Sequence, residues 1–509
     1  MERLLCRQIC AISRQRISAR RRKKILMPHP VYTRRAVLAS GLATAATCVA
    51  APGSTQQRII LNDASRLDPT PVMKHWQPKT EPKDAFIERL RTELNEAASA
   101  RRPVAVGAAR HSMGGQSLPR DGIAMTLDGR SLVANTTTGT YRIEAGARWA
   151  DVIRALDPIG FSPAIMQSNN DFGVAATFCV NAHGWPVPHS PFGSTVRSLR
   201  LVLADGALVD CSRTENGELF SLAMGGYGLF GIVVDLDIEM VRNVLLEPKV
   251  EVMPGDDFGD RFIKAIGTDG SIRMAYGRLS VARKGFFDEA VLVTYRPAAE
   301  QPDRLPPAPS SNLMTTVSRE IYRAQVGSET AKRVRWFAES RANPAISAGI
   351  ATRNTLLNEP VSNLANSDQR RTDILHEYFI PPPRFGEFLA ACREIIPPAR
   401  AEFLNVTLRF VASDETSTLA YAPSTRIAAV MSFSQEISPE GEVDMIETTE
   451  RLIDRVIALG GSFYLPYRLH ARRDQVEAVY PKVAQFVERK RFYDPKLLFR
   501  NAMWDAYFA

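Results

Sequence analysis

The sequence predicts an α+β fold with two domains, the second of which contains a mainly antiparallel sheet. Three observations lead to this prediction. The chain has 509 residues, 45% of them hydrophobic, which is enough for a sizeable core and more than one folding unit usually holds. The composition shifts near residue 245. Beyond that point expected strands alternate with expected helices, a pattern typical of an α+β domain.

The first 57 residues differ from the rest of the chain in charge. They hold eleven Lys or Arg residues and one acid, whereas the whole chain has a formal net charge of +9. The remaining residues therefore carry about −1, so no nucleic-acid partner is expected. Arg34-Arg35 precedes an uncharged run, Ala36–Ala51, which is shorter than the roughly 20 residues of a membrane span.

We expect residues 1–57 to be a twin-arginine-type signal that directs export to the periplasm or another extracytoplasmic space. A Sec signal and a retained anchor are the alternatives, and the true start is either Met1 or Met27. No stable membrane span is expected after processing. No metal site is expected either, because the cysteines beyond this segment form no CxxC pair.

The first domain begins with a helix and continues with strands. Residues 84–100 place apolar side chains at helical spacing, and a short apolar strand then enters a glycine-rich loop, residues 107–116. Asp205-Gly206 separates two strand-like segments, and this dipeptide is a strong hairpin signal. A glycine-rich turn and a long β-branched strand, residues 225–241, end the domain.

The second domain is expected over residues 246–455. Strand-like segments such as "SIRMAYGRLSVA" and "FLNVTLRFVA" alternate there with helices such as "FGEFLAACREII". The Pro-rich stretch "PAAEQPDRLPPAPSS" is a surface loop by composition. Residues 456–509 add a helix and an aromatic tail, which we expect to pack back on the first domain, residues 60–245.

The strongest chemical signal is the loop "GAARHSMGGQ", residues 107–116. Small residues let the backbone approach a ligand closely, and free N–H groups of such a loop can hold a pyrophosphate. The loop is neither G-x-G-x-x-G nor a Lys-bearing P-loop. Taken alone, the segment is better explained as a tight turn around a hydrogen-bonded histidine.

Two further segments make the set specific: "MQSNNDFGVAATFCVNAHG", residues 166–184, and "ENGELFSLAMGGYGLFGIVVDLDIEMV", residues 215–241. In this order the three segments resemble the FAD-linked oxidoreductases of the vanillyl-alcohol oxidase, or p-cresol methylhydroxylase (PCMH-type), superfamily. The motifs are nearest to those of cytokinin dehydrogenases and of aldonolactone and alditol oxidases. The resemblance implies a PCMH-type FAD-binding domain over residues 60–245 and an antiparallel substrate (cap) domain over residues 246–455.

The resemblance also implies which residues hold FAD. His111 is expected to bind the flavin covalently, and Arg110 stands where the family has glycine. Ala175-Ala176 replaces a glycine pair, which would limit access of oxygen to the flavin. The positions assigned to the cofactor are Gly107, Ala108, Ala109, Arg110, His111, Ser112, Gln116, Val174, Thr177, Asn181, His183, Gly184, Ile232, Val233 and Asn501.

The substrate side departs further from the relatives. Arg409 matches their substrate-facing arginine, although Thr407 stands where they carry Glu. Arg409 would stabilise a developing oxyanion or pair with a surface acid. Tyr467 and Arg468 replace an "H-W-x-K" motif and are expected near the flavin, with core packing as the alternative for Tyr467. Glu377 is a candidate base.

Three other residues have expected roles in substrate choice or at the surface. Ser168 occupies the place of the acid that cytokinin dehydrogenases use, and Asp171 lies nearby but out of register, so a cytokinin-type substrate is disfavoured. His470 is interpreted as part of a solvated surface segment.

The function predicted from these residues is FAD-dependent oxidation of a CH–OH group in a small polyol, sugar or aldonolactone, by hydride transfer to flavin N5. Dioxygen or another acceptor would reoxidise the flavin. A dehydrogenase of an amine or a lipid-linked sugar, and a flavin-binding protein without turnover, are the alternatives.

Overall fold

The computed structural model describes residues 59–78, 82–309, 320, 322–342, 349–361 and 368–509. Residues 57–509 pack as one unit. The expected export signal, residues 1–57, lies outside the described residues and stays a prediction. Among the described residues, no helix has both the length and the apolar character needed to cross a membrane.

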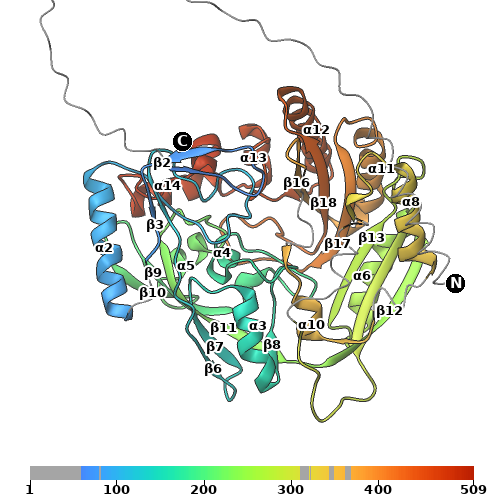
Figure 1. Ribbon diagram of the computed structural model, residues 1–509, viewed down its shortest axis with the longest axis horizontal. Helices are drawn as coiled ribbons and strands as arrows, with labels where there is room; N and C mark the ends of the chain where they lie inside the picture. The colour runs from blue at the N-terminus through green and yellow to red at the C-terminus, as the bar shows by residue number, and fades with distance from the viewer. Residues whose placement is uncertain (1–58, 79–81, 310–319, 321, 343–348, 362–367) are drawn as a thin grey trace, which may run out of the picture. The chain divides into compact units, whose positions relative to one another are not determined.

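Two small sheets and four helices form the first part of the fold (Figure 1). The parallel sheet has the order β3-β5-β4, and the antiparallel sheet has the order β10-β9-β11-β7-β6, with β8 also paired to β11. The strands are β3 (Lys74–Trp76), β4 (Val104–Val106), β5 (Ile123–Met125), β6 (Leu132–Asn135), β7 (Thr140–Glu144), β8 (Phe161–Pro163), β9 (Val196–Val202), β10 (Leu208–Ser212) and β11 (Ile232–Arg242). The helices are α2 (Lys83–Ser99), α3 (Trp149–Leu156), α4 (Val174–Cys179) and α5 (Gly217–Ala223).

The helix and the hairpin predicted in this part are both confirmed. Helix α2 buries Ile87, Leu90 and Leu94, which recur at the spacing of one helical face. Strands β9 and β10 pair antiparallel around Asp205-Gly206, where Gly206 takes the left-handed conformation that the turn requires.

An eight-stranded sheet forms the second part, and every pairing in it is antiparallel, as the sequence predicted. Its order is β15-β12-β14-β13-β17-β18-β16-β19. The strands are β12 (Leu245–Pro254), β13 (Met274–Leu279), β14 (Glu289–Pro297), β15 (Ala351–Thr352), β16 (Arg371–Ile380), β17 (Glu402–Val411), β18 (Arg426–Glu436) and β19 (Ser462–Phe463). The helices of this part are α6 (Phe258–Thr268), α8 (Glu329–Phe337), α10 (Arg353–Leu357), α11 (Phe385–Ile395) and α12 (Pro439–Ala458).

One face of this sheet packs on α6, α11 and α12 (Figure 1). Phe258 and Phe262 of α6 contact that face, where Gly277 leaves no room for a Cβ beside the ring of Phe258. Residues on one strand alternate between the two faces. The residues on either side of Gly277 in the sequence therefore point to the opposite face of the sheet. The residues of the adjacent strands that are paired with them point to the same face.

The strand register decides which polar side chains share that opposite face. Glu377 of β16 and Thr407 of β17 are both paired with Val430 of β18. Directly paired residues point to the same side of a sheet, and so do residues two apart on one strand. Glu377, Thr407 and Arg409 therefore lie on one face, although the chain separates them.

The C-terminal segment returns to the first part of the fold through α13 (Arg473–Val479) and α14 (Val483–Tyr493). Phe499 forms a parallel bridge with Val104 of β4, and the carboxylate of Asp494 accepts hydrogen bonds from the N–H groups of Leu498 and Phe499 at 2.8 Å each. These contacts fix the strand that leads into the 107–116 loop. A two-stranded ribbon, β1 (Ile59–Leu61) and β2 (Thr70–Val72), precedes β3.

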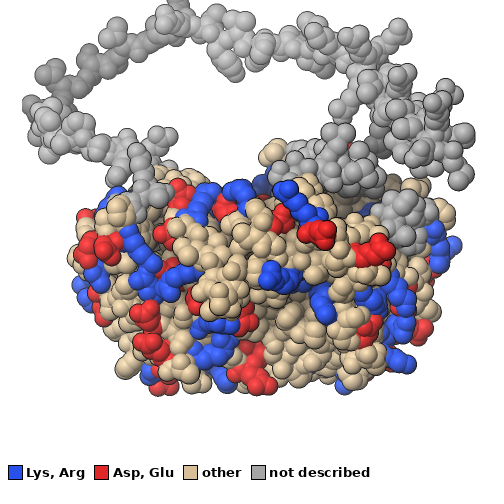
Figure 2. Space-filling model, turned by 90° about the horizontal axis from the view of Figure 1, so that it is seen from below, with Lys and Arg blue, Asp and Glu red and all other residues tan. Residues whose placement is uncertain are grey.

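Charges on the surface are mixed in sign. On the face drawn in Figure 2, the basic and acidic side chains of the described residues are interspersed. The excess of basic residues predicted from the sequence lies in residues 1–57, which are outside the described part.

Candidate functional site

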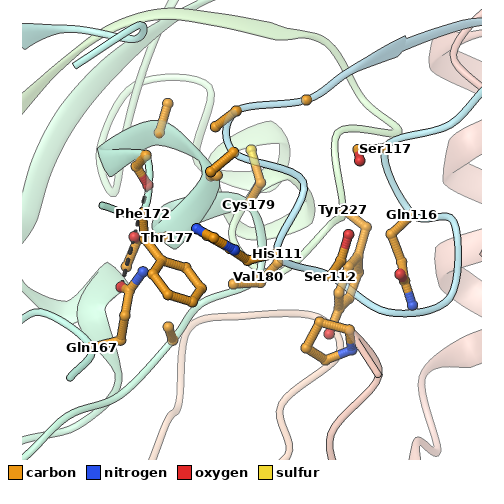
Figure 3. A pocket seen from close by; sticks show the side chains of 18 of the residues that line it. His111, Ser112, Gln116, Ser117, Gln167, Phe172, Thr177, Cys179, Val180 and Tyr227 are labelled. Atoms are coloured by element: carbon orange, nitrogen blue, oxygen red, sulfur yellow. Dashed lines mark hydrogen bonds between the residues drawn. The ribbon is translucent and has the colours of Figure 1, made fainter. Parts of the chain in front are cut away.

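A pocket lies between the 107–116 loop, the segment around α4 and the open face of the eight-stranded sheet (Figure 3). We call the loop the His111 loop. The segment around α4 contributes Gln167, Ser168, Asn169, Phe172, Gly173, Ala175, Ala176, Thr177, Cys179, Val180, Ala182 and His183. The sheet and the segment after it contribute Leu375, Glu377, Arg409, Val430, Tyr464, Pro466 and Tyr467.

The backbone of the His111 loop is suited to hold an anion. Within the described part of the chain, the N–H groups of residues 108–112 form no hydrogen bond, although all five residues line the pocket. The buried hydroxyl of Ser117, which also lines it, has no partner either. Consecutive unpaired N–H groups form an anion-binding concavity. The loop therefore fits the diphosphate of a dinucleotide such as FAD.

Arg110 keeps the backbone conformation that glycine would have at its position. Its φ is +55°, in the left-handed region. Its guanidinium donates to Thr126 Oγ1 at 2.9 Å and contacts His75 Nε2 at 3.0 Å. These contacts fix the guanidinium, while the aliphatic part of the side chain packs beside Gly107 of the same loop.

His111 projects into the pocket beside Phe172, with 4.3 Å between the ring centroids (Figure 3). His111 Nε2 lies 3.5 Å from a carboxylate oxygen of Asp171. Burial raises the pKa of Asp171, but the interaction with His111 and the backbone N–H of Val361 outweigh it, and the net direction is downward. The sequence assigned Asp171 no role, because it is out of register with the acid of cytokinin dehydrogenases. The fold nevertheless places its carboxylate beside His111.

Most of the positions assigned to the cofactor line the pocket: Gly107, Ala108, Ala109, Arg110, His111, Ser112, Gln116, Thr177, His183, Ile232 and Val233. Thr177 acts through its hydroxyl, which donates to Gln167 Oε1 at 2.8 Å and so orients that amide in the wall. Gln167 was not predicted, because nothing in its local sequence distinguishes it.

Four assigned positions are not among the residues that line the pocket, and their contact with the cofactor stays a prediction: Val174, Asn181, Gly184 and Asn501. Val174 is fully buried in α4. A Cβ at Gly184 would lie 1.9 Å from the carbonyl oxygen of Met166, so this glycine serves close backbone packing. Asn181 hydrogen-bonds Asp414.

Asn501 supports the His111 loop from behind. Its amide donates to the carbonyl oxygens of Gln116 and Tyr227 at 2.9 and 3.2 Å. Asn501 thus positions the loop and does not itself line the pocket.

A buried polar group is formed by Glu377, His183 and Tyr467. One oxygen of Glu377 forms a very short hydrogen bond with His183 Nε2, and the hydroxyl of Tyr467 donates to the other at 3.0 Å. Burial raises the pKa of Glu377, but His183, Arg409 and Tyr467 lower it more, and the net direction is downward. Burial lowers the pKa of His183, so its neutral ring donates to an ionised Glu377.

The sequence had placed Glu377 on the opposite face of its strand from His376 and Tyr378, and the structure agrees. His376 Nδ1 and the hydroxyl of Tyr378 are hydrogen-bonded at 3.2 Å away from the pocket, whereas Glu377 lines it. The contact of Glu377 with His183 joins segments 194 residues apart. No local pattern could have revealed it.

Arg409 lies beside this group. Its guanidinium donates to Ser168 Oγ at 2.5 Å and to the carbonyl oxygen of His183 at 3.3 Å, while its buried Nε has no partner. Among the described residues no ion pair joins Arg409 to a carboxylate, and Arg409 lines the pocket. Burial lowers the pKa of Arg409, and Glu377 opposes that effect.

Arg468 does not line the pocket, and its catalytic role stays a prediction. Its guanidinium pairs with Asp68 at 2.6 Å and with Glu442, behind the His111 loop. His470 is also not the solvated surface residue that was expected. It is buried and contacts Glu442 at 2.9 Å.

Comparison with known proteins agrees with this geometry. Residues 85–212 match the FAD binding domain family. An alditol oxidase from a Streptomyces species is 33% identical over 150 residues, which are 29% of this chain and 34% of that protein. Cytokinin dehydrogenase 8 of Oryza sativa subsp. indica is 33% identical over 168 residues, 30% of this chain and 31% of that protein.

A mitochondrial L-galactono-1,4-lactone dehydrogenase from Brassica oleracea is 24% identical over 246 residues, 48% of this chain and 39% of that protein. The chain thus spans less than two fifths of the length of each of these relatives. The loop and residues 85–212 therefore resemble the FAD-binding domain of these relatives.

Proposed function

We propose that this chain oxidises a CH–OH group of a small polyol, sugar or aldonolactone with FAD as its cofactor. The observation that carries the proposal is the convergence of Glu377, Tyr467 and Arg409 on the pocket that the His111 loop lines. A proton acceptor and a cation in one pocket are what dehydrogenation of an alcohol needs from the protein. Bound FAD supplies the remaining chemistry, because it accepts a hydride from the substrate carbon.

Glu377 is the proton acceptor in this proposal. Within the described ranges, its ionised carboxylate forms no ion pair with Lys or Arg and contacts the neutral ring of His183, so a substrate hydroxyl proton can be accepted there. Burial raises the pKa of Tyr467 well above its usual range, so its hydroxyl stays protonated and donates to Glu377. The substrate proton reaches Glu377 either directly or through this hydroxyl.

Arg409 stabilises the substrate oxygen as negative charge develops on it. The guanidinium is fixed by Ser168 and by the carbonyl oxygen of His183, and its Nε has no protein partner. A preorganised cation in a site with little water favours developing negative charge strongly. Because Ser168 replaces the acid of cytokinin dehydrogenases, the cation is left available for an oxygen instead of being neutralised by a neighbour.

His111 is proposed to carry the flavin covalently. Its place in the pocket wall and the carboxylate of Asp171 beside its ring support this assignment. Denaturation in acid provides the test: yellow colour that stays with the precipitated protein supports the bond, and colour that remains in solution contradicts it. The acceptor that reoxidises the flavin is dioxygen or another oxidant.

Export by a twin-arginine-type signal remains a separate proposal. It rests on Arg34-Arg35 and the uncharged run that follows. Residues 1–57 fused to a folded reporter should direct it out of the cytoplasm, and Arg34→Lys together with Arg35→Lys should abolish export. Export that persists in this variant would contradict the proposal.

Anaerobic reduction of the bound flavin tests the activity. Polyols, aldonolactones, amines and lipid-linked sugars are mixed in turn with the holoprotein, and bleaching of the flavin is followed. We expect a polyol, sugar or lactone to bleach it. Glu377→Gln should slow bleaching by about 10²- to 10⁴-fold. Glu436→Gln, at the exposed end of β18, is the matched control and should bleach at the rate of the unchanged protein.

Two results would contradict the proposal. If only amines bleach the flavin, the chain is a dehydrogenase of CH–NH donors and the proposed oxidation of a CH–OH group is wrong. Equal rates in Glu377→Gln and in the unchanged protein would remove Glu377 as the proton acceptor.

A further inference from the structure

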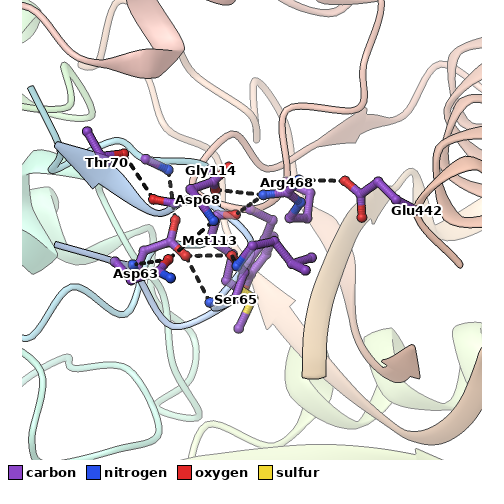
Figure 4. Close-up of polar contacts among 12 residues, drawn as sticks. Asp63, Ser65, Asp68, Thr70, Met113, Gly114, Glu442 and Arg468 are labelled. Carbon is purple, nitrogen blue, oxygen red and sulfur yellow. Dashed lines mark hydrogen bonds and ion pairs between the residues drawn. The ribbon is translucent and has the colours of Figure 1, made fainter. Parts of the chain in front are cut away.

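A polar network joins the His111 loop to Asp63, Asp68 and Arg468, none of which lines the pocket (Figure 4). It is built by the segment of residues 62–68, which connects β1 to β2. The N–H of Ala64 donates to the carbonyl oxygens of Arg110 and Ser112 at 3.0 and 3.4 Å. This N-terminal segment is therefore bonded directly to the residues that present the free N–H groups to the pocket.

Asp63 makes the central contact of this network. One of its carboxylate oxygens accepts from the N–H of Gly115 at 2.8 Å, and the other accepts from the N–H and hydroxyl of Ser65 at 2.9 and 2.5 Å. Gly115 has φ +69°, so it is the sharp turn of the loop. Asp63 thus fixes the turn by which the His111 loop reverses direction.

Asp68 brings a second carboxyl group to the same place. Its negative charge acts to raise the pKa of Asp63, and its carboxylate accepts from Arg468 at 2.6 Å. Arg468 in turn donates to the carbonyl oxygen of Met113 at 3.3 Å. The buried carboxyl group of Asp63 therefore contacts the His111 loop directly. The carboxyl group of Asp68 is connected to the same loop through the cation of Arg468.

We propose that Asp63 is a positioning residue for the His111 loop and that, together with Asp68, it makes the ordering of this loop dependent on pH. When Asp63 is protonated, it donates a hydrogen bond to Asp68 and still accepts from Gly115. When both groups are ionised, like charges face each other in a poorly solvated place, and opening of the loop relieves the repulsion. This role is distinct from the proposed substrate chemistry, since neither group reaches the pocket.

The surroundings of Asp63 indicate the direction and the range of the effect. Burial raises the pKa of Asp63 to about 6, with Asp68 acting in the same direction and the bonds from Ser65 and Gly115 opposing it. A carboxyl group with a raised pKa in the closed state favours that state when protonated. The loop should therefore be better ordered below about pH 6 than above it. The other charged or titratable groups of the network are Arg468, Glu442 and His470.

These other groups do not reverse the expected direction. Burial acts to raise the pKa of Glu442, but Arg468 and His470 lower it strongly, and burial lowers the pKa of His470. Glu442 therefore stays ionised and His470 moves further toward its neutral form in the range where Asp63 titrates.

Hydrogen–deuterium exchange of the intact protein tests the proposal without requiring turnover. Exchange of peptides covering residues 107–118 is measured between about pH 5 and pH 8 and corrected for the intrinsic pH dependence of exchange. We expect protection to fall about 10-fold or more as pH rises through about 6. Asp63→Asn keeps an acceptor for Gly115 and a donor for Asp68, so its protection should be high and constant with pH.

A second variant keeps the proposal testable if Asp63→Asn does not fold. Asp68→Asn removes the facing charge, so the loss of protection should move to a lower pH. Peptides from β18 serve as the internal control and should show the same protection at each pH. The proposal is overturned if the unchanged protein shows constant protection in the loop, or if both variants follow its pH profile.

Discussion

Asp494 provides the strongest test of how the C-terminal segment supports the fold. Its carboxylate is almost fully buried, contacts Lys490 Nζ at 2.5 Å and accepts two backbone N–H groups. Lys490 is fully buried as well and also donates to the carbonyl oxygen of Leu229 at 2.6 Å. Asp494→Asn keeps the shape of the side chain and one acceptor but removes the charge.

The expected loss in free energy of unfolding arises because the buried charge of Lys490 would have no partner of opposite charge in Asp494→Asn. Removing one partner of a buried ion pair costs about 3–5 kcal/mol, because the other charge is left without compensation. Burial already lowers the pKa of Lys490 to about 8 in the presence of Asp494. In Asp494→Asn this lysine would have to lose its proton at neutral pH, and deprotonating a lysine of ordinary pKa at pH 7 costs about 5 kcal/mol. The two estimates agree.

Urea unfolding followed by circular dichroism measures the free energy of unfolding of the variants. We expect Asp494→Asn to lose about 3–5 kcal/mol, and the double variant with Lys490→Met to lose less, because no unpaired charge remains. Asp505→Asn is the matched control: it breaks an exposed pair with Arg500 and should cost less than about 1 kcal/mol. A loss below about 1 kcal/mol for Asp494→Asn, or a double variant that loses the sum of both single changes, would refute the reasoning.

Three further outcomes are expected. Asp171→Asn should slow covalent attachment of FAD to His111 at least 10-fold, measured as acid-stable flavin against time, and unchanged kinetics would separate Asp171 from His111. Arg409→Met should reduce the rate of flavin reduction by substrate about 10²- to 10³-fold while FAD content stays constant, and a normal rate would exclude a role for this cation. Burial lowers the pKa of His376 to about 3, so between about pH 6.5 and 3 the unfolded chain binds a proton that the folded chain does not. The free energy of unfolding should therefore fall by up to about 1.4 kcal/mol for each pH unit as the pH drops through this range. His376→Gln should remove this contribution, which a comparison of unfolding midpoints at several pH values would reveal.

Features set by local chemistry could be predicted from the sequence. Helix α2 follows from apolar residues at helical spacing, and the β9–β10 hairpin follows from Asp205-Gly206. The orientation of Glu377 away from its two neighbours follows from the alternation of side chains along a strand. The His111 loop could be located because its small residues follow a strand and because, together with residues 166–184 and 215–241, it resembles the FAD-binding motifs of a known superfamily.

Features set by contacts between distant segments could not be predicted. The contact of His183 with Glu377 depends on how β16 is placed against the segment after α4. Arg468 was expected near the flavin because it stands in the segment that replaces the H-W-x-K motif of the similar oxidases. Adjacent residues point in different directions, however, and only Tyr467 lines the pocket. Asp63 gave no signal at all, because a single acid before a short strand has no distinctive pattern.

Binding of FAD to the His111 loop is the claim on which the account depends, and titration of the apoprotein with FAD measures it directly. The account predicts that the protein binds one FAD per chain and that Ser112→Ala binds it as well. Ser112→Asp should fold normally but bind none, because a carboxylate would then repel the diphosphate at the free N–H groups. A folded protein that takes up no FAD, or equal binding by Ser112→Asp and the unchanged protein, would contradict the account.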